Sequence, residues 1–208
     1  MPDFKFENEY DFDVVGIDEA GRGPWVGPVV AGAVVIKNKQ LAEDLKTGLD
    51  DSKKLTAKKR EALYERLFEE ERAGRLYIGI GEASAQEIDE LNILQATFLA
   101  MKRAVEQLPF CPQMALIDGN RTPKVFPCPS KSIIKGDSYS LSISAASIVA
   151  KVYRDRLMKE LSLKYPGYGF EKNAGYGTSA HIEGLKKQGV TPEHRRSYKP
   201  IKNFLQKN

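Results

Sequence analysis

Short apolar segments alternate along the chain with longer amphipathic ones. The short segments are rich in Val and Ile and are flanked by Gly, Pro or Asp, which predicts strands at 13–17, 28–36, 76–80, 114–117 and 132–134. The longer segments carry apolar residues on one face, which predicts helices at 56–73, 92–107 and 139–165. This order of elements indicates an α/β fold, in which helices cover a sheet. We expect the first two strands to pair as an antiparallel hairpin.

The composition changes after residue 165. From there the chain is rich in Gly, Lys, His and aromatic residues, in the segments GYGF, AGYGTSAH and HRRSYKP. We therefore interpret residues 1–165 as the main domain and residues 166–208 as a small helical C-terminal extension. A chain of 208 residues is long enough to bury a substantial core in this way.

Composition narrows the class of protein. Hydrophobic residues make up 41% of the chain, which is typical of a folded globule, and the formal net charge of +4 permits an anionic partner. Cys111 and Cys128 lie far apart and outside any C-x-x-C pair, which favours free thiols over a zinc site or a disulfide framework. No apolar run approaches the roughly 20 residues that span a bilayer, and the N-terminus is acidic. We expect a soluble, cytoplasmic protein without membrane association.

Four carboxylates lie near the ends of three predicted strands, each close to a glycine. They are Asp18, Glu19, Asp118 and Asp137. Adjacent residues in a strand face opposite sides, so Asp18 and Glu19 can share a site only where the first strand ends and the chain bends, and the glycines immediately after them can supply that bend. We expect that bend, and we expect the four carboxylates to converge.

A cluster of this kind favours a metal site. Uncompensated carboxylates repel one another and raise each other's pKa values, so they need cations. Ligand sets made only of oxygen select Mg²⁺ or Mn²⁺ over zinc. Two such ions, about 4 Å apart, activate water and stabilise the leaving oxygen in phosphodiester hydrolysis. Taken singly, Asp118 or Asp137 is better explained as a turn residue, but the four together favour metal.

The turn Gly21-Arg22-Gly23 follows the first two carboxylates. Without Cβ atoms at its glycines, the backbone can approach a ligand and offer N–H and C=O groups to a sugar hydroxyl or a phosphate. A plain tight turn explains the same residues equally well.

Basic side chains provide candidate phosphate contacts. The candidates are Lys53, Lys54, Lys151, Arg154, Arg195 and Arg196. Charges on a helix are more often a solvated face, and that alternative stays open for each of them. We interpret His181 and His194 as histidines satisfied by local hydrogen bonds rather than as ligands.

Motifs spread over nearly the whole chain carry a resemblance. They are GIDEAGRGP with VGPVVAGAVV after it, DSKKL, IDELNILQA, LIDGN, KGD, ISAASIVAKVYRDRLM, GYGT and HRRSYKP. In this order they resemble bacterial ribonuclease HII. The resemblance implies a ribonuclease H-like fold with a mixed five-stranded sheet flanked by helices. It also implies a four-carboxylate site for two Mn²⁺ or Mg²⁺ ions at the positions selected above.

The resemblance implies an activity and a way of reading the substrate. The implied enzyme hydrolyses the RNA strand of RNA–DNA hybrids and cuts 5′ of single ribonucleotides in duplex DNA, leaving a 3′-hydroxyl and a 5′-phosphate. The backbone of Gly21, Arg22 and Gly23 would read the ribose 2′-hydroxyl, and Tyr176 would stack on the deoxyribose that follows. Because Tyr176 lies in the extension, residues 166–208 would complete the substrate site.

Two positions depart from the family pattern. The family commonly has a small or aliphatic residue at position 25, where this chain has Trp, and Pro or Ala at position 177, where it has Gly. Trp25 is expected either to alter the edge of the substrate site or to serve packing alone.

Two other functions fit the sequence less well. Ribonuclease HIII has similar chemistry, but that family typically carries an extra N-terminal domain and lacks the Gly-Arg-Gly turn. A non-catalytic nucleic-acid-binding module is disfavoured, since an unused anionic cluster would weaken binding to a polyanion. We expect a monomer. The final segment IKNFLQKN is either a docking tail for a replication-associated protein or a last helical turn.

Overall fold

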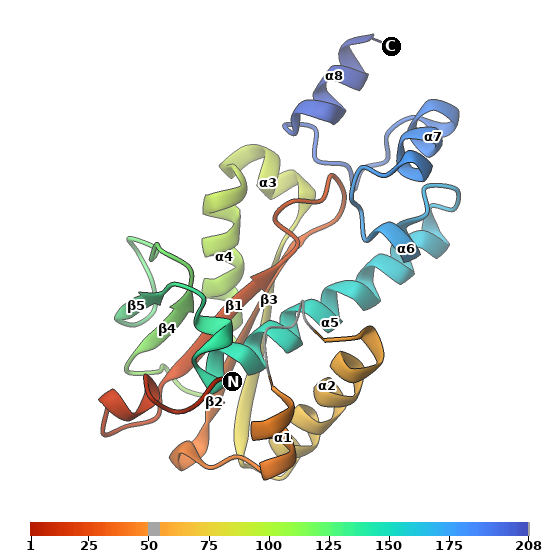
Figure 1. Cartoon of the computed structure of the whole chain (residues 1–208). Helices are drawn as coiled ribbons and strands as arrows, with labels where there is room; N and C mark the ends of the chain where they lie inside the picture. The colour runs from red at the N-terminus through yellow and green to blue at the C-terminus, as the bar shows by residue number, and fades with distance from the viewer. Residues whose placement is uncertain (50–54, 208) are drawn as a thin grey trace.

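The computed structural model of the chain describes residues 1–49 and 55–207, and its centre is one mixed five-stranded sheet in the order β3-β2-β1-β4-β5 (Figure 1). The strands are β1 (Val15–Ala20), β2 (Val29–Ile36), β3 (Leu76–Ala83), β4 (Ala115–Asp118) and β5 (Ser130–Ile133). β1, β2 and β3 pair antiparallel, whereas β1, β4 and β5 pair parallel. The predicted fold class and the hairpin of the first two strands are confirmed.

Helices flank the sheet and extend beyond it. They are α1 (Glu43–Gly48), α2 (Ala57–Arg72), α3 (Ala85–Leu91), α4 (Ile93–Glu106), α5 (Leu141–Lys164), α6 (Phe170–Asn173), α7 (Ser179–Gln188) and α8 (Lys199–Lys207). Short 3₁₀ turns occur at η1 (Glu7–Glu9), η2 (Lys37–Lys39) and η3 (Gly136–Ser138). The three predicted helices correspond to α2, α4 and α5. The pattern missed α1 and α3, which are too short to show a clear apolar stripe.

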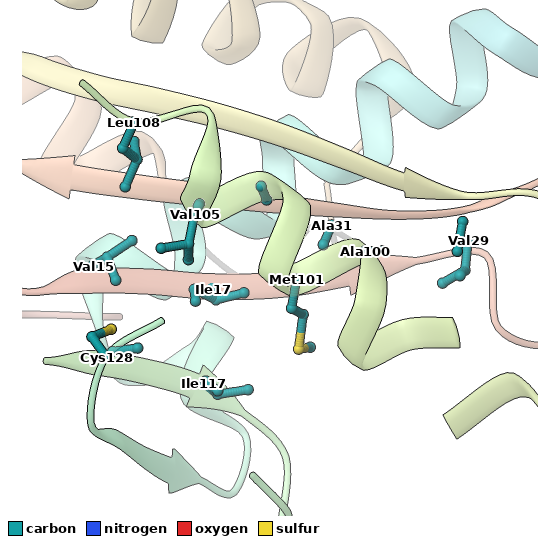
Figure 2. Packing of buried hydrophobic residues seen from close by; sticks show 14 of the residues in the cluster. Val15, Ile17, Val29, Ala31, Ala100, Met101, Val105, Leu108, Ile117 and Cys128 are labelled. Atoms are coloured by element: carbon teal, nitrogen blue, oxygen red, sulfur yellow. The ribbon is translucent and has the colours of Figure 1, made fainter. Parts of the chain in front are cut away.

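Each face of the sheet is covered by a helix that approaches closely. On one face, α4 packs Ala100, Met101 and Val105 over the β1 side chains Val15 and Ile17 (Figure 2). On the other face, α5 and α2 form a second apolar core with β2 and β3. Glycine in the strands permits this approach, because a Cβ atom on Gly32 would lie 2.5 Å from a backbone oxygen of α5. The core therefore lies on both sides of β1, the strand that carries the first two carboxylates.

Among the C-terminal helices, α6 lies beside the far end of α5, whereas α7 and α8 lie beyond it (Figure 1). A separate apolar cluster joins them to the β1–β2 turn, and its buried members are Val26, Met158, Tyr168, Phe170, Leu185 and Ile201. This cluster brings residues of the extension next to the turn that follows Asp18 and Glu19. Among the described residues, no helix is long and apolar enough to cross a membrane.

Candidate active site

Asp18 and Glu19 lie inside β1 rather than beyond its end. The antiparallel ladder with β2 continues through Ala20, so the expectation that the strand ends before Asp18 is wrong. Successive strand residues face opposite sides of a sheet. The Asp18 side chain lies toward Ser147 of α5, whereas Glu19 lines a depression on the α4 side. The two carboxylates therefore lie near the C-terminal end of the central strand, on opposite faces of the sheet.

Asp18 is buried near the end of β1, with 6% of its surface exposed. Burial raises the pKa of its carboxyl well above the usual range, and the negative charges of Glu19 and Asp118 raise it further. Hydrogen bonds from Ser147 and from the Glu19 backbone N–H, which donates to Asp18 Oδ1 at 2.7 Å, lower the pKa in part. A buried carboxylate beside other carboxylates is stabilised in its charged form by a cation.

Asp118 and Asp137 are connected through one turn. Asp118 ends β4, the parallel neighbour of β1, and Asp137 is buried in η3 before α5. The Gly136 N–H donates to Asp118 Oδ1 at 2.6 Å, which ties the end of β4 to the turn that holds Asp137. Lys135 precedes this turn with a left-handed backbone (φ 57°), a conformation that costs roughly 1–3 kcal/mol for a residue other than glycine. The left-handed conformation of Lys135 turns the chain from β5 into η3 and then α5.

The donor chemistry of the site fits a hard divalent cation. Within residues 1–49 and 55–207, however, no group of three or more Asp, Glu, His or Cys side chains is arranged to hold a metal ion by itself. The negative charges of Glu19 and Asp118 raise the pKa of Asp18, which supports the expected convergence of these three, while a shared metal site of all four carboxylates stays a prediction. Mg²⁺ in nucleotide sites usually takes one or two carboxylates and completes its shell with water and substrate phosphate. The arrangement suits cations that bind together with a phosphate.

A pocket of about 490 Å³ opens beside Asp18 and Glu19. Tyr176 reaches it from the C-terminal extension and packs on the turn, since a Cβ atom on Gly23 would lie 3.3 Å from the ring. About half of Tyr176 stays exposed, at 52%. The Arg22 side chain bends back to Glu19, with Nη1 3.1 Å from Oε1. The pocket thus brings the Gly-Arg-Gly turn, Tyr176 and two carboxylates together.

Arg195 holds the turn from inside the protein. Its side chain is fully buried and donates to the carbonyl oxygens of Gly21 (2.6 Å), Arg22 (3.0 Å) and Gly27 (2.9 and 2.8 Å), and to the Tyr198 hydroxyl at 3.0 Å. The prediction of a phosphate contact is therefore wrong for Arg195, because its guanidinium has no surface for a ligand and is occupied by backbone oxygens.

Arg154 has a similar role from α5. It is 2% exposed at the floor of the pocket and donates to the carbonyl oxygens of Val26, Pro28 and Ala174 at 3.0–3.1 Å. A Cβ atom on Gly21, whose φ of +94° already favours glycine, would lie 2.0 Å from Arg154 Nε. The expected phosphate contact is therefore wrong for Arg154 as well: the arginine supports the turn, and glycine at position 21 makes room for it.

The remaining basic candidates have different positions. Lys151 lines the pocket and pairs with Asp155 at 2.6 Å, and Arg196 is exposed. Lys53 and Lys54 lie outside the described residues. Phosphate contacts by these side chains stay predictions.

Two polar side chains of the pocket were not predicted, those of Ser147 in α5 and Arg60 in α2. Ser147 has a signal in the sequence, since it is a polar residue within the apolar run ISAASIVA. Arg60 has none, because the exposed faces of its helix carry many charges.

His181 and His194 form a hydrogen-bonded pair behind Tyr176. The Thr191 N–H donates to His194 Nδ1 at 2.9 Å, so neutral His194 carries its proton on Nε2 and donates it to His181 Nε2, 3.1 Å away. His181 then carries its proton on Nδ1 and donates it to the Tyr176 carbonyl at 3.0 Å. The interpretation of locally satisfied histidines is confirmed, and the pair fixes the backbone of Tyr176.

We expect acid to destabilise the protein through this pair. Burial lowers the pKa of His194 to about 4, with the nearby His181 adding to the effect, and burial also lowers the pKa of His181. Above pH 6.5 both rings are neutral in the folded and the unfolded chain, so nothing is lost. Below pH 6.5, the two histidines bind protons in the unfolded chain but stay neutral in the folded chain. The free energy of unfolding therefore falls by on the order of 3 kcal/mol for His194 by pH 4.

Urea unfolding between pH 4 and pH 8 measures this loss. A His181→Gln/His194→Gln variant is the control, and its stability should decline less steeply because both titrating groups are gone. Parallel declines in the parent and the variant would contradict the assignment.

Trp25 fills the space that a side chain at position 177 would need. A Cβ atom on Gly177 would lie 1.9 Å from the Trp25 ring, whose centroid is 5.4 Å from that of His181. The two departures from the ribonuclease HII pattern therefore compensate each other, and Trp25 has a packing role.

Comparisons with known proteins agree on one family. The family model described as ribonuclease HII matches residues 15–201. The ribonuclease HII of Gluconobacter oxydans (strain 621H) is 54% identical over 206 residues, which cover 99% of this chain and 97% of that protein.

Solved structures show the same fold. The ribonuclease H2 from Pyrococcus horikoshii OT3 superposes with a TM-score of 0.75 at 30% identity, over 94% of this chain and 98% of that one. Bst-RNase HIII in complex with Mn²⁺ superposes with a TM-score of 0.72 at 18% identity, over 94% of this chain and 70% of that one. At this identity the second likeness concerns the fold alone.

Proposed function

The chain belongs to the ribonuclease HII family and is a nuclease of the ribonuclease H type, and from this premise we propose that it cuts on the 5′ side of single ribonucleotides embedded in duplex DNA. It also hydrolyses the RNA strand of RNA–DNA hybrids, the activity that the family name implies. The proposed products are a 3′-hydroxyl and a 5′-phosphate. The family supports the substrate class, and the residues that line the pocket support the choice of a single ribonucleotide, which the resemblance implies.

The observation that carries the proposal is the contact between the Tyr176 ring and the turn at Gly23, beside Asp18 and Glu19. The 2′-hydroxyl is the group that marks a ribonucleotide within DNA. Backbone groups of the turn can hydrogen-bond to it, because glycine lets the sugar come close. The exposed face of Tyr176 then stacks on the next sugar and favours a deoxyribose, since a second 2′-hydroxyl would crowd the ring. Together they select the junction where RNA gives way to DNA.

The carboxylates supply the chemistry of the cut. Asp18, Glu19, Asp118 and Asp137 would hold two divalent cations, Mn²⁺ or Mg²⁺, together with the scissile phosphate. When bound, such ions activate the attacking water and stabilise the leaving oxygen. The ion pair between Arg22 and Glu19 links the turn at residues 21–23 to one of the proposed metal ligands.

A Tyr176→Ala variant tests the reading of the junction. Loss of the ring removes a stacking surface worth about 1–3 kcal/mol against a nucleic acid base, while all four carboxylates stay in place. We expect cleavage of a duplex with one ribonucleotide to fall about tenfold or more, and cleavage of a continuous hybrid to fall much less. Both rates are measured side by side with the parent.

Tyr176→Phe is the matched control, because it keeps the ring and should retain the preference for the junction. Equal losses on the two substrates in Tyr176→Ala would show that Tyr176 is structural and that the turn alone reads the junction.

Assembly and partners belong to the same proposal. The final segment forms the helix α8, with Ile201 buried and Leu205 40% exposed. Docking of a replication-associated protein on it, the monomeric state and the cytoplasmic location stay predictions.

A further inference from the structure

A depression on the α4 face of the sheet begins at the carboxylates. Glu19, Asp118 and Asn120 line its inner end, Phe98 and Arg121 its outer end, and its volume is about 390 Å³. It lies on the opposite side of β1 from Ser147, and apart from Glu19 and Arg22 it shares no residue with the pocket of Tyr176. A second route therefore leads away from the site of the cut.

This depression continues into a larger one of about 650 Å³. The two share Leu94, Phe98 and Arg121, so they form one groove between α4 and the loop that joins β4 to β5, which lie beside each other in Figure 1. We call this combined feature the α4 groove. Lys102, Lys124 and Val125 complete its outer part. None of the residues that line this larger depression lines the Tyr176 pocket.

The charge changes sign along the α4 groove. At its inner end Arg22 pairs with Glu19, and Asp118 adds a further carboxylate, whereas Lys102, Arg121 and Lys124 line the outer part. No carboxylate lines the outer part, although Lys102 pairs with Glu106 at 2.8 Å, which leaves Arg121 and Lys124 as its unpaired cations among the described residues. Arg121 and Lys124 are exposed and form no ion pair within the part of the chain that the structure describes. Cations left unpaired beside a wall without carboxylates favour an anionic ligand.

The floor of the groove is apolar. Leu94, Phe98 and Leu99 are partly buried side chains of α4, and Val125 on the opposite wall is 83% exposed. A site for free phosphate does not need such a floor. A nucleic-acid strand does use one, since its sugars and bases present apolar and stacking faces between phosphates that are spaced along a chain.

We propose that the α4 groove binds the sugar–phosphate backbone of the substrate outside the cut, with Arg121 and Lys124 contacting phosphates. This inference rests on the proposed function, because one phosphate of the same strand must reach the carboxylates. The contacts made in the groove are sequence-independent and are made equally before and during the reaction. They increase affinity for long substrates and leave the chemical step unchanged.

An Arg121→Ala/Lys124→Ala variant tests the groove. Binding to a long RNA–DNA hybrid is measured in EDTA, where cleavage is off, over a range of salt concentrations. Each lost phosphate contact reduces the slope of log K against log salt by about 1, so the double variant should have a slope lower by about 2. We expect its Kd at physiological salt to rise about tenfold or more. With a divalent cation, KM should rise and kcat should stay at the parental value.

The matched control is Arg72→Ala/Lys186→Ala. It removes one Arg and one Lys that are also exposed and that line neither the α4 groove nor the Tyr176 pocket. Its slope and Kd should equal those of the parent. If the alanine double variant melts at a lower temperature, Arg121→Gln/Lys124→Gln replaces it in the same assays.

The outcomes separate the two proposals. If the parent cleaves hybrids and the double variant keeps the parental salt slope, the proposed binding of substrate in the α4 groove is wrong, and the proposed function stands. A parent that neither binds nor cleaves hybrids would overturn the proposed function, and the groove with it. A lower slope together with a lower kcat would also contradict the inference, since the groove would then act on the chemical step.

Discussion

An Asp18→Asn variant is expected to lose cleavage of RNA–DNA hybrids by about 10³-fold or more, while it binds the hybrid as tightly as the parent or more tightly. Asp18 is buried near the end of β1, and the charges of both Glu19 and Asp118 raise the pKa of its carboxyl. The amide cannot replace a charged oxygen ligand, and metal-ion catalysis is worth several kcal/mol of transition-state stabilisation. Binding is retained because the change removes a negative charge beside the phosphates of the substrate.

The control for this variant is Asp11→Asn. Asp11 is exposed in the segment before β1, so the same chemical change there should leave cleavage and binding at the parental values. Asp18→Asn should melt no lower than the parent, since it removes a buried charge that is costly in the absence of metal. Parental turnover by Asp18→Asn would exclude Asp18 from the site.

An Arg195→Met variant is expected to lose on the order of 3–5 kcal/mol in the free energy of unfolding. Its guanidinium satisfies the carbonyl oxygens of Gly21, Arg22 and Gly27 inside the protein, and methionine would leave these acceptors buried with fewer donors. Urea unfolding measures the loss. Cleavage should fall as well, because the turn that we propose to read the 2′-hydroxyl loses its support.

Arg196→Met is the matched control, with the same substitution one residue along the chain. Its side chain is exposed, so stability should change by no more than about 0.5 kcal/mol, while affinity for the hybrid falls if Arg196 contacts phosphate. Arg195→Lys should recover part of the stability, since it keeps the charge but not the planar fork. Equal stability of Arg195→Met and the parent would show that the turn holds itself.

The order of strands and helices could be predicted because apolar periodicity reports burial, and burial dominates the fold. The end of β1 could not. The apolar run stops at Ile17, but the ladder with β2 continues to Ala20, since hydrogen-bonded pairing of the backbone does not depend on side-chain polarity. The positions of Asp18 and Glu19 on opposite faces therefore became visible only in the structure.

The sequence singles out the carboxylates as candidates for the site, but it does not reveal the roles of the arginines. Asp18, Glu19 and Asp118 could be proposed from the sequence because they lie at predicted strand ends as a group, whereas a single Asp at such a position is usually a turn residue. Arg195 and Arg196 have the same side chain and adjacent positions, and only contacts with residues far away in the chain decide that one is buried and the other exposed. A pattern read along a single sequence does not contain those contacts.

The histidine pair and the Trp25–Gly177 contact show the same limit. Each joins residues from different segments of the chain. The hydrogen bond that one histidine can make depends on the other histidine, and the space available at position 177 depends on the Trp25 ring. His181 was correctly interpreted as locally satisfied, but the direction of its hydrogen bond to the Tyr176 carbonyl depends on Thr191, at the other end of the pair.

We propose that one site both recognises a ribonucleotide and cuts beside it with the help of divalent cations. To test this, the protein is incubated with a DNA duplex that contains a single ribonucleotide, in Mg²⁺, in Mn²⁺ or in EDTA, and the ends of the products are mapped. We expect one nick on the 5′ side of the ribonucleotide, with a 3′-hydroxyl and a 5′-phosphate, only when a divalent cation is present. Cleavage in EDTA, a nick on the 3′ side, or no cleavage with either cation would contradict it.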